Sequence, residues 1–160
     1  MPKPTVVSYA RTFPVPLDQA FDGVLTLPLT EFFARRYGPI PRVRSTESTA
    51  EWGEVGRTRI IRLADGGSLH EELTEVTRPS AFGYVLSDIR GPMKPLASRI
   101  DGRFTFAPDG AGTRIEWSWA LHPRSVLSAP LLPIFGRIWG RMAKRAFDRL
   151  DRILPEHAAG

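Results

Sequence analysis

Between residues 42 and 122, apolar and polar positions alternate along short runs, and turns rich in glycine or proline separate the runs. Alternation with a period of two predicts strands that bury one face. With a further run near the start of the chain, the predicted strands cover residues 5–13, 42–49, 56–63, 68–77, 81–88, 97–107 and 113–122. Because the connections between the last six are short, these strands should form an antiparallel meander.

The period changes after Pro123, where apolar residues recur every three or four positions. They are Leu131, Ile134, Phe135, Ile138, Trp139, Met142, Ala146, Phe147, Leu150, Ile153 and Leu154. Basic residues lie largely off this stripe, so the segment predicts one amphipathic helix. Ser128 and Pro130 suit its start, and about six to seven turns would let it cross the whole sheet.

Two shorter helices are predicted between the first strand and the meander. Apolar residues at helical spacing mark residues 17–25, and Thr30 can cap a second helix that runs to Arg36. No repeat or linker divides the chain, so residues 1–160 should form one domain. The predicted fold is α+β, with a curved antiparallel sheet of about seven strands wrapped around the C-terminal helix.

Strand alternation turns a group of large side chains toward that helix. The group comprises Tyr84, Phe104, Trp117 and Trp119 on the strands, opposed by Phe135, Trp139 and Met142 on the helix. Two interpretations fit this pattern. The rings either fill an ordinary core or form the wall of a cavity that holds a small molecule.

Two charged residues share faces with inward apolar residues. Arg59 lies on the face of Ile61, and Glu71 lies on the face of Leu73. A three-residue Asp65-Gly66-Gly67 loop would put both sets inside, with Ile61 opposite Glu71 and Arg59 as its diagonal neighbour. A two-residue loop would instead turn Glu71 outward. Inside the sheet, the charges would need pairing or water.

Charge and composition narrow the possible functions. The formal charge is +5, but the basic residues are spread along the chain, so nucleic-acid binding is not expected. There is no cysteine, and no histidine pair or acidic cluster has metal-ligand spacing. Phosphate-loop and dinucleotide motifs are also missing, so neither a metal nor a cofactor is expected. The sequence shows no secretory signal and no span-length apolar run, which favours a cytoplasmic protein without stable membrane insertion.

Two features near the start of the long helix each have two interpretations that the sequence leaves open. Gly136 and Gly140 either pack closely against the sheet or leave room for a ligand. Val126-Leu127 and Leu131-Leu132 form an apolar lead-in that suits a mobile lid or an edge that touches a membrane.

The turns and strand faces resemble one known family. The segments that carry the resemblance are Gly56-Arg57-Thr58-Arg59, Asp65-Gly66-Gly67, Glu71 to Val76, Phe82-Gly83-Tyr84, Gly102 to Phe106, Pro108-Asp109-Gly110, Gly112 to Ile115 and Trp117. Together they are similar to the polyketide cyclase/dehydrase branch of the START-like superfamily over about residues 5–154. These motifs are specific for the fold and say little about activity.

The resemblance implies a helix-grip fold with a hydrophobic cavity, which relatives use for lipids, sterols, plant hormones and polyketides. Some relatives cyclise or dehydrate polyketide chains, whereas many only bind or carry a ligand. Glu71 resembles the inward acid that plant hormone receptors of this superfamily place near their ligand. Arg59 resembles a neighbouring inward basic residue. No recognised catalytic set transfers to this chain.

Three hypotheses follow. The leading one is a binder of a hydrophobic small molecule, with Arg59, Ile61, Glu71, Leu73 and the seven large side chains named above as ligand-binding residues. The second is a cyclase or dehydratase, with Glu71 as general acid or base and Tyr84 as donor. The third is a module whose basic helix face contacts an anionic membrane or nucleic acid. The sequence leaves the ligand, any catalysis and the oligomeric state open.

Overall fold

A computed structural model describes residues 3–48 and 50–159, and it confirms the α+β helix-grip architecture. The elements are β1 (Thr5–Phe13), α1 (Leu17–Thr26), α2 (Leu29–Phe32), β2 (Val43–Glu47), β3 (Thr58–Leu63), β4 (Ser68–Thr77), β5 (Ala81–Arg90), β6 (Ala97–Asp109), β7 (Gly112–Pro123), the 3₁₀ turn η1 (Ala129–Leu131) and α3 (Leu132–Ala159).

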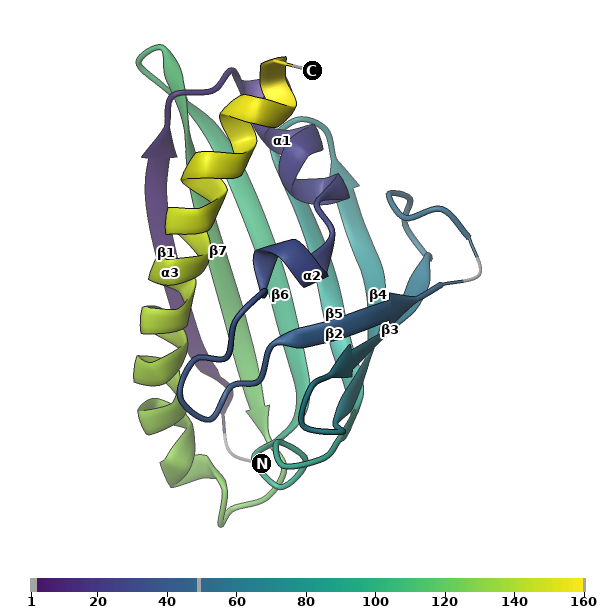
Figure 1. The fold of residues 1–160 in the computed structure, drawn as a ribbon. Coiled ribbons are helices and arrows are strands. Elements are labelled where there is room, and N and C mark those ends of the chain that lie inside the picture. Colours follow the sequence, from purple (N-terminus) through teal and green to yellow (C-terminus); the bar gives the residue numbers. More distant parts are fainter. Residues whose placement is uncertain (1–2, 49, 160) are drawn as a thin grey trace.

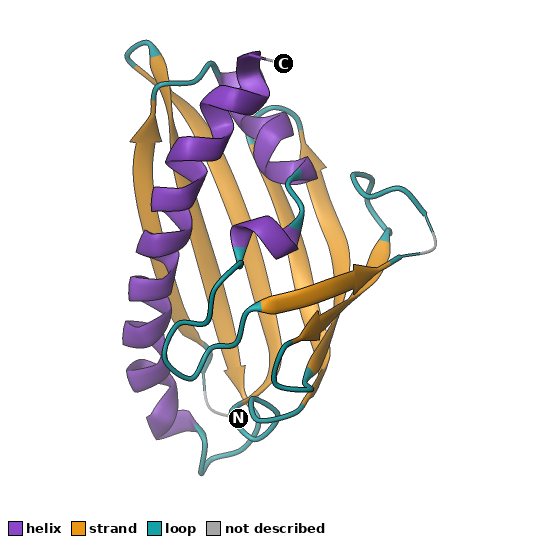
Figure 2. Cartoon of the chain, viewed as in Figure 1, coloured by secondary structure: helices purple, strands orange, loops and turns teal. Residues whose placement is uncertain are grey.

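The strands form one antiparallel sheet in the order β1-β7-β6-β5-β4-β3-β2. The sheet curls, and all three α-helices lie on its concave side (Figures 1 and 2). Helix α3 packs on β1 and β7, while α1 contacts β6, β7 and α3. The core therefore lies between the concave face and the helices. Within the described residues, no helix is long and apolar enough to cross a membrane.

The predicted inner faces are buried. On β7, the side chains of Ile115, Trp117, Trp119 and Leu121 are at most 8% exposed, and the alternate residues of that strand face outward. The same alternation buries Phe82, Tyr84 and Leu86 on β5 and Ile100, Phe104 and Phe106 on β6. Apolar alternation therefore predicted both the strands and the faces that they bury.

The β3–β4 hairpin keeps the predicted parity but not the predicted register. Arg59 lies directly opposite Glu71, and Ile61 lies opposite Leu69 rather than Glu71. The hairpin closes one residue earlier than expected, because the Leu63 N–H donates to the Gly67 carbonyl and Gly66 takes the left-handed position at φ 89°. A shift of two residues leaves every side chain on its face, so Glu71 still points inward.

Two predicted helix boundaries were wrong. Helix α2 has four residues, Leu29–Phe32, and does not reach Arg36. Thr30 is not its cap: Pro28 occupies the N-cap, and the chain leaves helical geometry at Phe33.

The predicted apolar stripe of the long helix is buried or half-buried from Phe135 onward, whereas Leu131 and Ile134 at its start are 49% and 59% exposed.

The two glycines of α3 differ in their surroundings. A Cβ on Gly136 would lie 2.7 Å from Cγ1 of Val7 on β1, so this glycine allows close packing of helix on sheet. A Cβ on Gly140 would meet nothing within 4 Å. Close packing therefore explains Gly136 only.

We predict opposite effects for alanine at these positions. Gly140→Ala should stabilise the protein by about 0.5–1 kcal/mol, because alanine is the better helix former. Gly136→Ala should be at least about 1 kcal/mol less stable than Gly140→Ala, because a stiff β-branched Val7 must move. Urea unfolding of the two variants measures the difference, and equal stabilities would contradict the packing of Gly136.

Candidate functional site

A cavity lies between the sheet, the α1–α2 segment and the N-terminal half of α3. The space open to the centres of water molecules is about 90 Å³, whereas one water needs roughly 10–15 Å³. Its wall is apolar apart from Arg59, Glu71, the Tyr84 hydroxyl and the indole nitrogens. The interior thus contains a void larger than one solvent molecule.

Most of the predicted ligand-binding residues lie on this wall. They are Arg59, Ile61, Glu71, Tyr84, Phe104, Trp117, Trp119, Phe135 and Met142. Leu73 and Trp139 are fully buried and lie outside the wall. Trp139 packs instead against Trp117 and Trp119, with ring centroids 4.9 and 5.6 Å apart.

A further part of the wall, which the sequence pattern did not predict, comes from α1, α2 and the loops. This part includes Leu27, Leu29, Phe32, Phe33, Ile40, Pro41 and Trp52. The apolar spacing of residues 17–25 could have indicated an inward α1, but the loop residues carry no periodic signal. Trp52 is therefore visible only in the folded structure.

Arg59 and Glu71 form a buried ion pair on the wall. Arg59 Nε donates to Glu71 Oε1 at 2.6 Å, and the two side chains are 11% and 5% exposed. The guanidinium lies over the Trp52 ring, 3.8 Å from its centroid, which adds a cation–π contact. Burial raises the pKa of Glu71 above its usual range, while Arg59 acts in the opposite direction.

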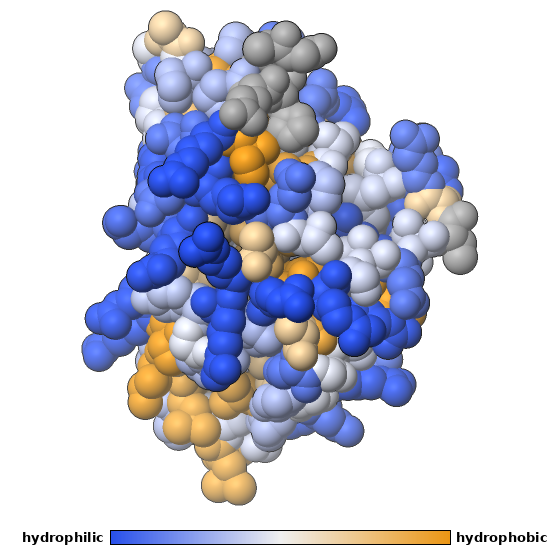
Figure 3. Space-filling model, viewed as in Figure 1, coloured by the Kyte–Doolittle hydropathy of each residue, from blue (hydrophilic) through white to orange (hydrophobic). Residues whose placement is uncertain are grey.

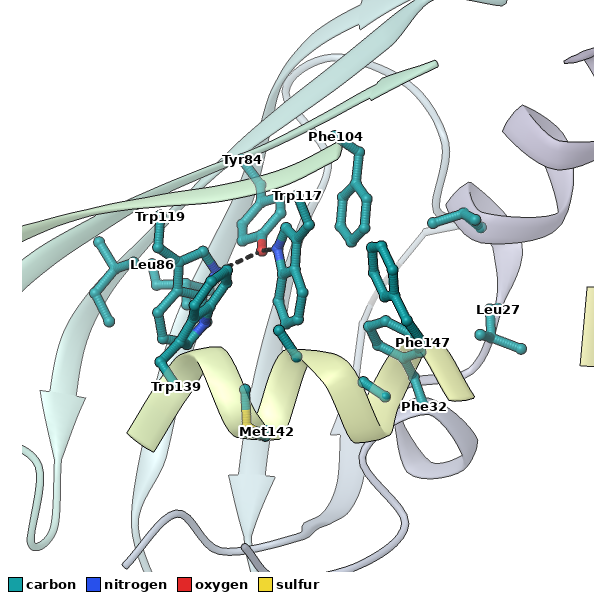
Figure 4. Packing of buried hydrophobic residues seen from close by; sticks show 14 of the residues in the cluster. Leu27, Phe32, Tyr84, Leu86, Phe104, Trp117, Trp119, Trp139, Met142 and Phe147 are labelled. Atoms are coloured by element: carbon teal, nitrogen blue, oxygen red, sulfur yellow. Dashed lines mark hydrogen bonds between the residues drawn. The ribbon is translucent and has the colours of Figure 1, made fainter. Parts of the chain in front are cut away.

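Tyr84 presents its hydroxyl at the centre of the aromatic cluster. The indole N–H groups of Trp117 and Trp119 both donate to this oxygen at 2.9 Å (Figure 4). The ring lies across Gly102 on β6, where a Cβ would be only 2.1 Å from Tyr84 Cζ. Because the oxygen accepts two bonds, its own hydrogen is the group that remains to donate.

Burial raises the pKa of Tyr84 far above its ordinary value, and the charge of nearby Glu71 adds to the effect. The phenol is therefore protonated throughout the physiological range. The site offers one hydroxyl donor, one carboxyl group and one guanidinium in an otherwise apolar cavity.

Across the described residues, no group of three or more His, Asp or Glu side chains could hold a metal ion. Among the polar groups that these residues place on the cavity wall there is one carboxyl group, that of Glu71, and its Oε1 accepts from Arg59.

The comparisons with known proteins agree with this geometry. The sequence model of the family described as "Polyketide cyclase / dehydrase and lipid transport" matches residues 4–154. The chain belongs to this family. It is thereby placed in the polyketide cyclase/dehydrase branch of the START-like superfamily, as the sequence motifs predicted. No curated protein matches the sequence.

Solved structures share the fold of this polyketide cyclase/dehydrase family member at low identity. The crystal structure of Ara h 8.0201 has a TM-score of 0.71 and 15% identity, with 96% of this chain and 99% of that chain covered. TTHA0849 from Thermus thermophilus has a TM-score of 0.71 and 15% identity over 95% and 98%. Ginseng major latex-like protein 151 from Panax ginseng has a TM-score of 0.70 and 9% identity over 94% and 97%.

We predict that Tyr84→Phe destabilises the protein by about 1–3 kcal/mol, because two buried indole N–H groups lose their acceptor. Urea unfolding followed by far-ultraviolet circular dichroism measures this loss. Tyr9→Phe is the control, since the Tyr9 hydroxyl accepts from Arg11 at a half-buried site and its removal should cost under about 1 kcal/mol. A Tyr84→Phe variant as stable as the parent would show that the two indole bonds contribute nothing.

Proposed function

We propose that the protein binds a hydrophobic small molecule in the cavity and holds the molecule's polar end at Glu71, Arg59 and Tyr84. The observation that carries this proposal is the apolar cavity with those three polar side chains on its wall. Cavities of this composition are typical ligand sites, because apolar walls supply affinity and a few polar groups fix orientation.

The charges on the wall favour a neutral ligand. Arg59 is already paired with Glu71, so an anionic ligand would have to compete with a 2.6 Å ion pair. A second carboxylate in this buried site would have no cation of its own and would therefore carry a large desolvation cost. A hydroxyl or carbonyl oxygen avoids both costs, since either can accept from Tyr84 and a hydroxyl can also donate to Glu71.

The family supports the same class of compound. Its description names polyketides and lipids, and both combine apolar carbon skeletons with oxygen-bearing groups. A neutral polyketide- or lipid-like molecule matches an apolar wall that carries a few hydrogen-bonding side chains.

A filling substitution should test the cavity. Ile61 lies on the wall and is 4% exposed, so Ile61→Phe should occupy part of the void and weaken binding at least about tenfold. The readout is fluorescence titration with the neutral apolar probe N-phenyl-1-naphthylamine.

Ile60→Phe is the matched control, because Ile60 is the adjacent residue on the outer face of β3 and is 37% exposed. Circular dichroism checks that both variants fold. A parent protein that binds no probe, or two variants that bind it equally, would contradict a ligand site in the cavity.

A second candidate function is acid–base catalysis on a polyketide-like substrate in the same cavity. The observation that favours it is a buried carboxyl group on the cavity wall whose pKa is raised by desolvation. Such a group is better matched to proton transfer near neutral pH than an ordinary glutamate.

We predict that any cyclisation or dehydration of a synthetic β-polyketone thioester falls at least about 100-fold in Glu71→Gln, while binding persists. Product analysis by liquid chromatography and mass spectrometry measures turnover. Glu75→Gln is the control on the same strand, because Glu75 pairs with Arg103 on the outer face. Unchanged turnover in Glu71→Gln would remove Glu71 from the chemistry.

A further inference from the structure

Four large apolar side chains cluster on the surface where α3 begins. We define the apolar tip as Val126, Leu127, Leu131 and Ile134, which are 75%, 87%, 49% and 59% exposed. Figure 3 shows apolar surface gathered at this end of the molecule. Exposed aliphatic clusters are unfavourable in water, so a contiguous one indicates a contact surface.

Hydrogen bonds hold the tip in shape. The Ser125 N–H donates to Ser128 Oγ at 3.0 Å, and the Ser128 hydroxyl donates to the Ser125 carbonyl at 3.0 Å. Val126 and Leu127 lie between these two serines and form the apex of the turn. Their exposure is therefore built into the loop.

The segment that carries the tip contains no acidic residue. Between Glu116 and Asp148 the sequence has no Asp or Glu, but it has Arg124, Arg137, Arg141, Lys144 and Arg145. Their five positive charges match the formal net charge of +5, so the positive and negative charges in the rest of the chain cancel. The tip is thus flanked by positive charge without nearby carboxylates in the sequence.

A basic hollow lies directly beside the tip. Arg90, Lys94 and Arg124 line it, together with Asp88, which pairs with Arg90. Arg124 is anchored because its guanidinium donates to the carbonyls of Lys94 and Ala97 at 2.9 and 3.2 Å. Since Arg124 is two residues from Val126, cationic groups and the apex belong to the same end of the molecule.

We propose that the apolar tip docks on an anionic lipid bilayer. Val126 and Leu127 enter the boundary between headgroups and acyl chains, while Lys94, Arg124 and Arg137 lie among the lipid phosphates. Aliphatic insertion and electrostatic attraction are each weak alone and reinforce one another, which gives reversible peripheral binding. The segment between Glu116 and Asp148, which has basic but no acidic residues, favours an anionic surface, and the convex apex suits a bilayer rather than a second copy of this chain.

Vesicle sedimentation tests the proposal without any knowledge of the cavity ligand. The protein should bind vesicles of phosphatidylcholine mixed with phosphatidylglycerol, bind phosphatidylcholine alone far more weakly, and dissociate as salt rises. The double variant Val126→Ser, Leu127→Ser should lower the bound fraction at least about tenfold. Val55→Ser is the matched control, because Val55 is 59% exposed in the loop between β2 and β3.

Equal binding to neutral and anionic vesicles, or no binding to either, would overturn the proposal. Salt-insensitive binding would also overturn it. So would sedimentation of the free protein as a dimer that the double variant abolishes, because the tip would then cover a second copy.

The absence of cysteine allows a second, site-specific measurement. Leu127→Cys and, as control, Val55→Cys can each be labelled with an environment-sensitive nitrobenzoxadiazole dye. Anionic vesicles should shift the emission of the dye at position 127 to shorter wavelength and leave position 55 unchanged. No shift at position 127, or the same shift at both positions, would show that the tip does not enter the bilayer.

Discussion

The concave face of the sheet is larger than one helix can cover, and this constraint shapes the rest of the structure. Helix α3 packs on β1 and β7, at one side of the curved sheet. The remaining inner face is covered by α1, α2 and the segment before β2. These are short elements, and in the part of the chain that the structure describes no second long helix lies on this part of the sheet. Short elements fill such a hollow incompletely, and the cavity lies where they approach β3, β4 and β5.

Sheet register couples the polar groups of the site to the packing of α3. One row of paired residues runs across the sheet through Leu73, Tyr84, Gly102, Trp119 and Val7. Because Gly102 lacks a side chain, the Tyr84 ring can lie over it, and the Tyr84 hydroxyl oxygen accepts from the indole N–H of Trp119. At the end of the row, Val7 meets Gly136 of α3. A register slip would therefore disrupt the hydroxyl site and the helix contact together.

The sequence predicted the features that depend on periodic apolar positions, and it did not predict those that depend on single loop residues or on turn geometry. Alternation identified the inward faces, because each strand contributes several residues to one signal. The predicted register of β3 on β4 was wrong by two residues, because the glycines at positions 66 and 67 are compatible with more than one loop conformation. The inward position of Trp52 was not predicted, because a residue in a loop belongs to no periodic pattern of apolar positions. Helical spacing could not separate the exposed Leu131 and Ile134 from the buried Phe135, because exposure at a helix end depends on how far its partner extends.

The first turns of α3 link the two proposed sites. Ile134 belongs to the apolar tip, and the next residue, Phe135, lies on the cavity wall. Because these side chains project from one helical turn, a displacement of that turn at a bilayer surface would move the wall of the cavity as well.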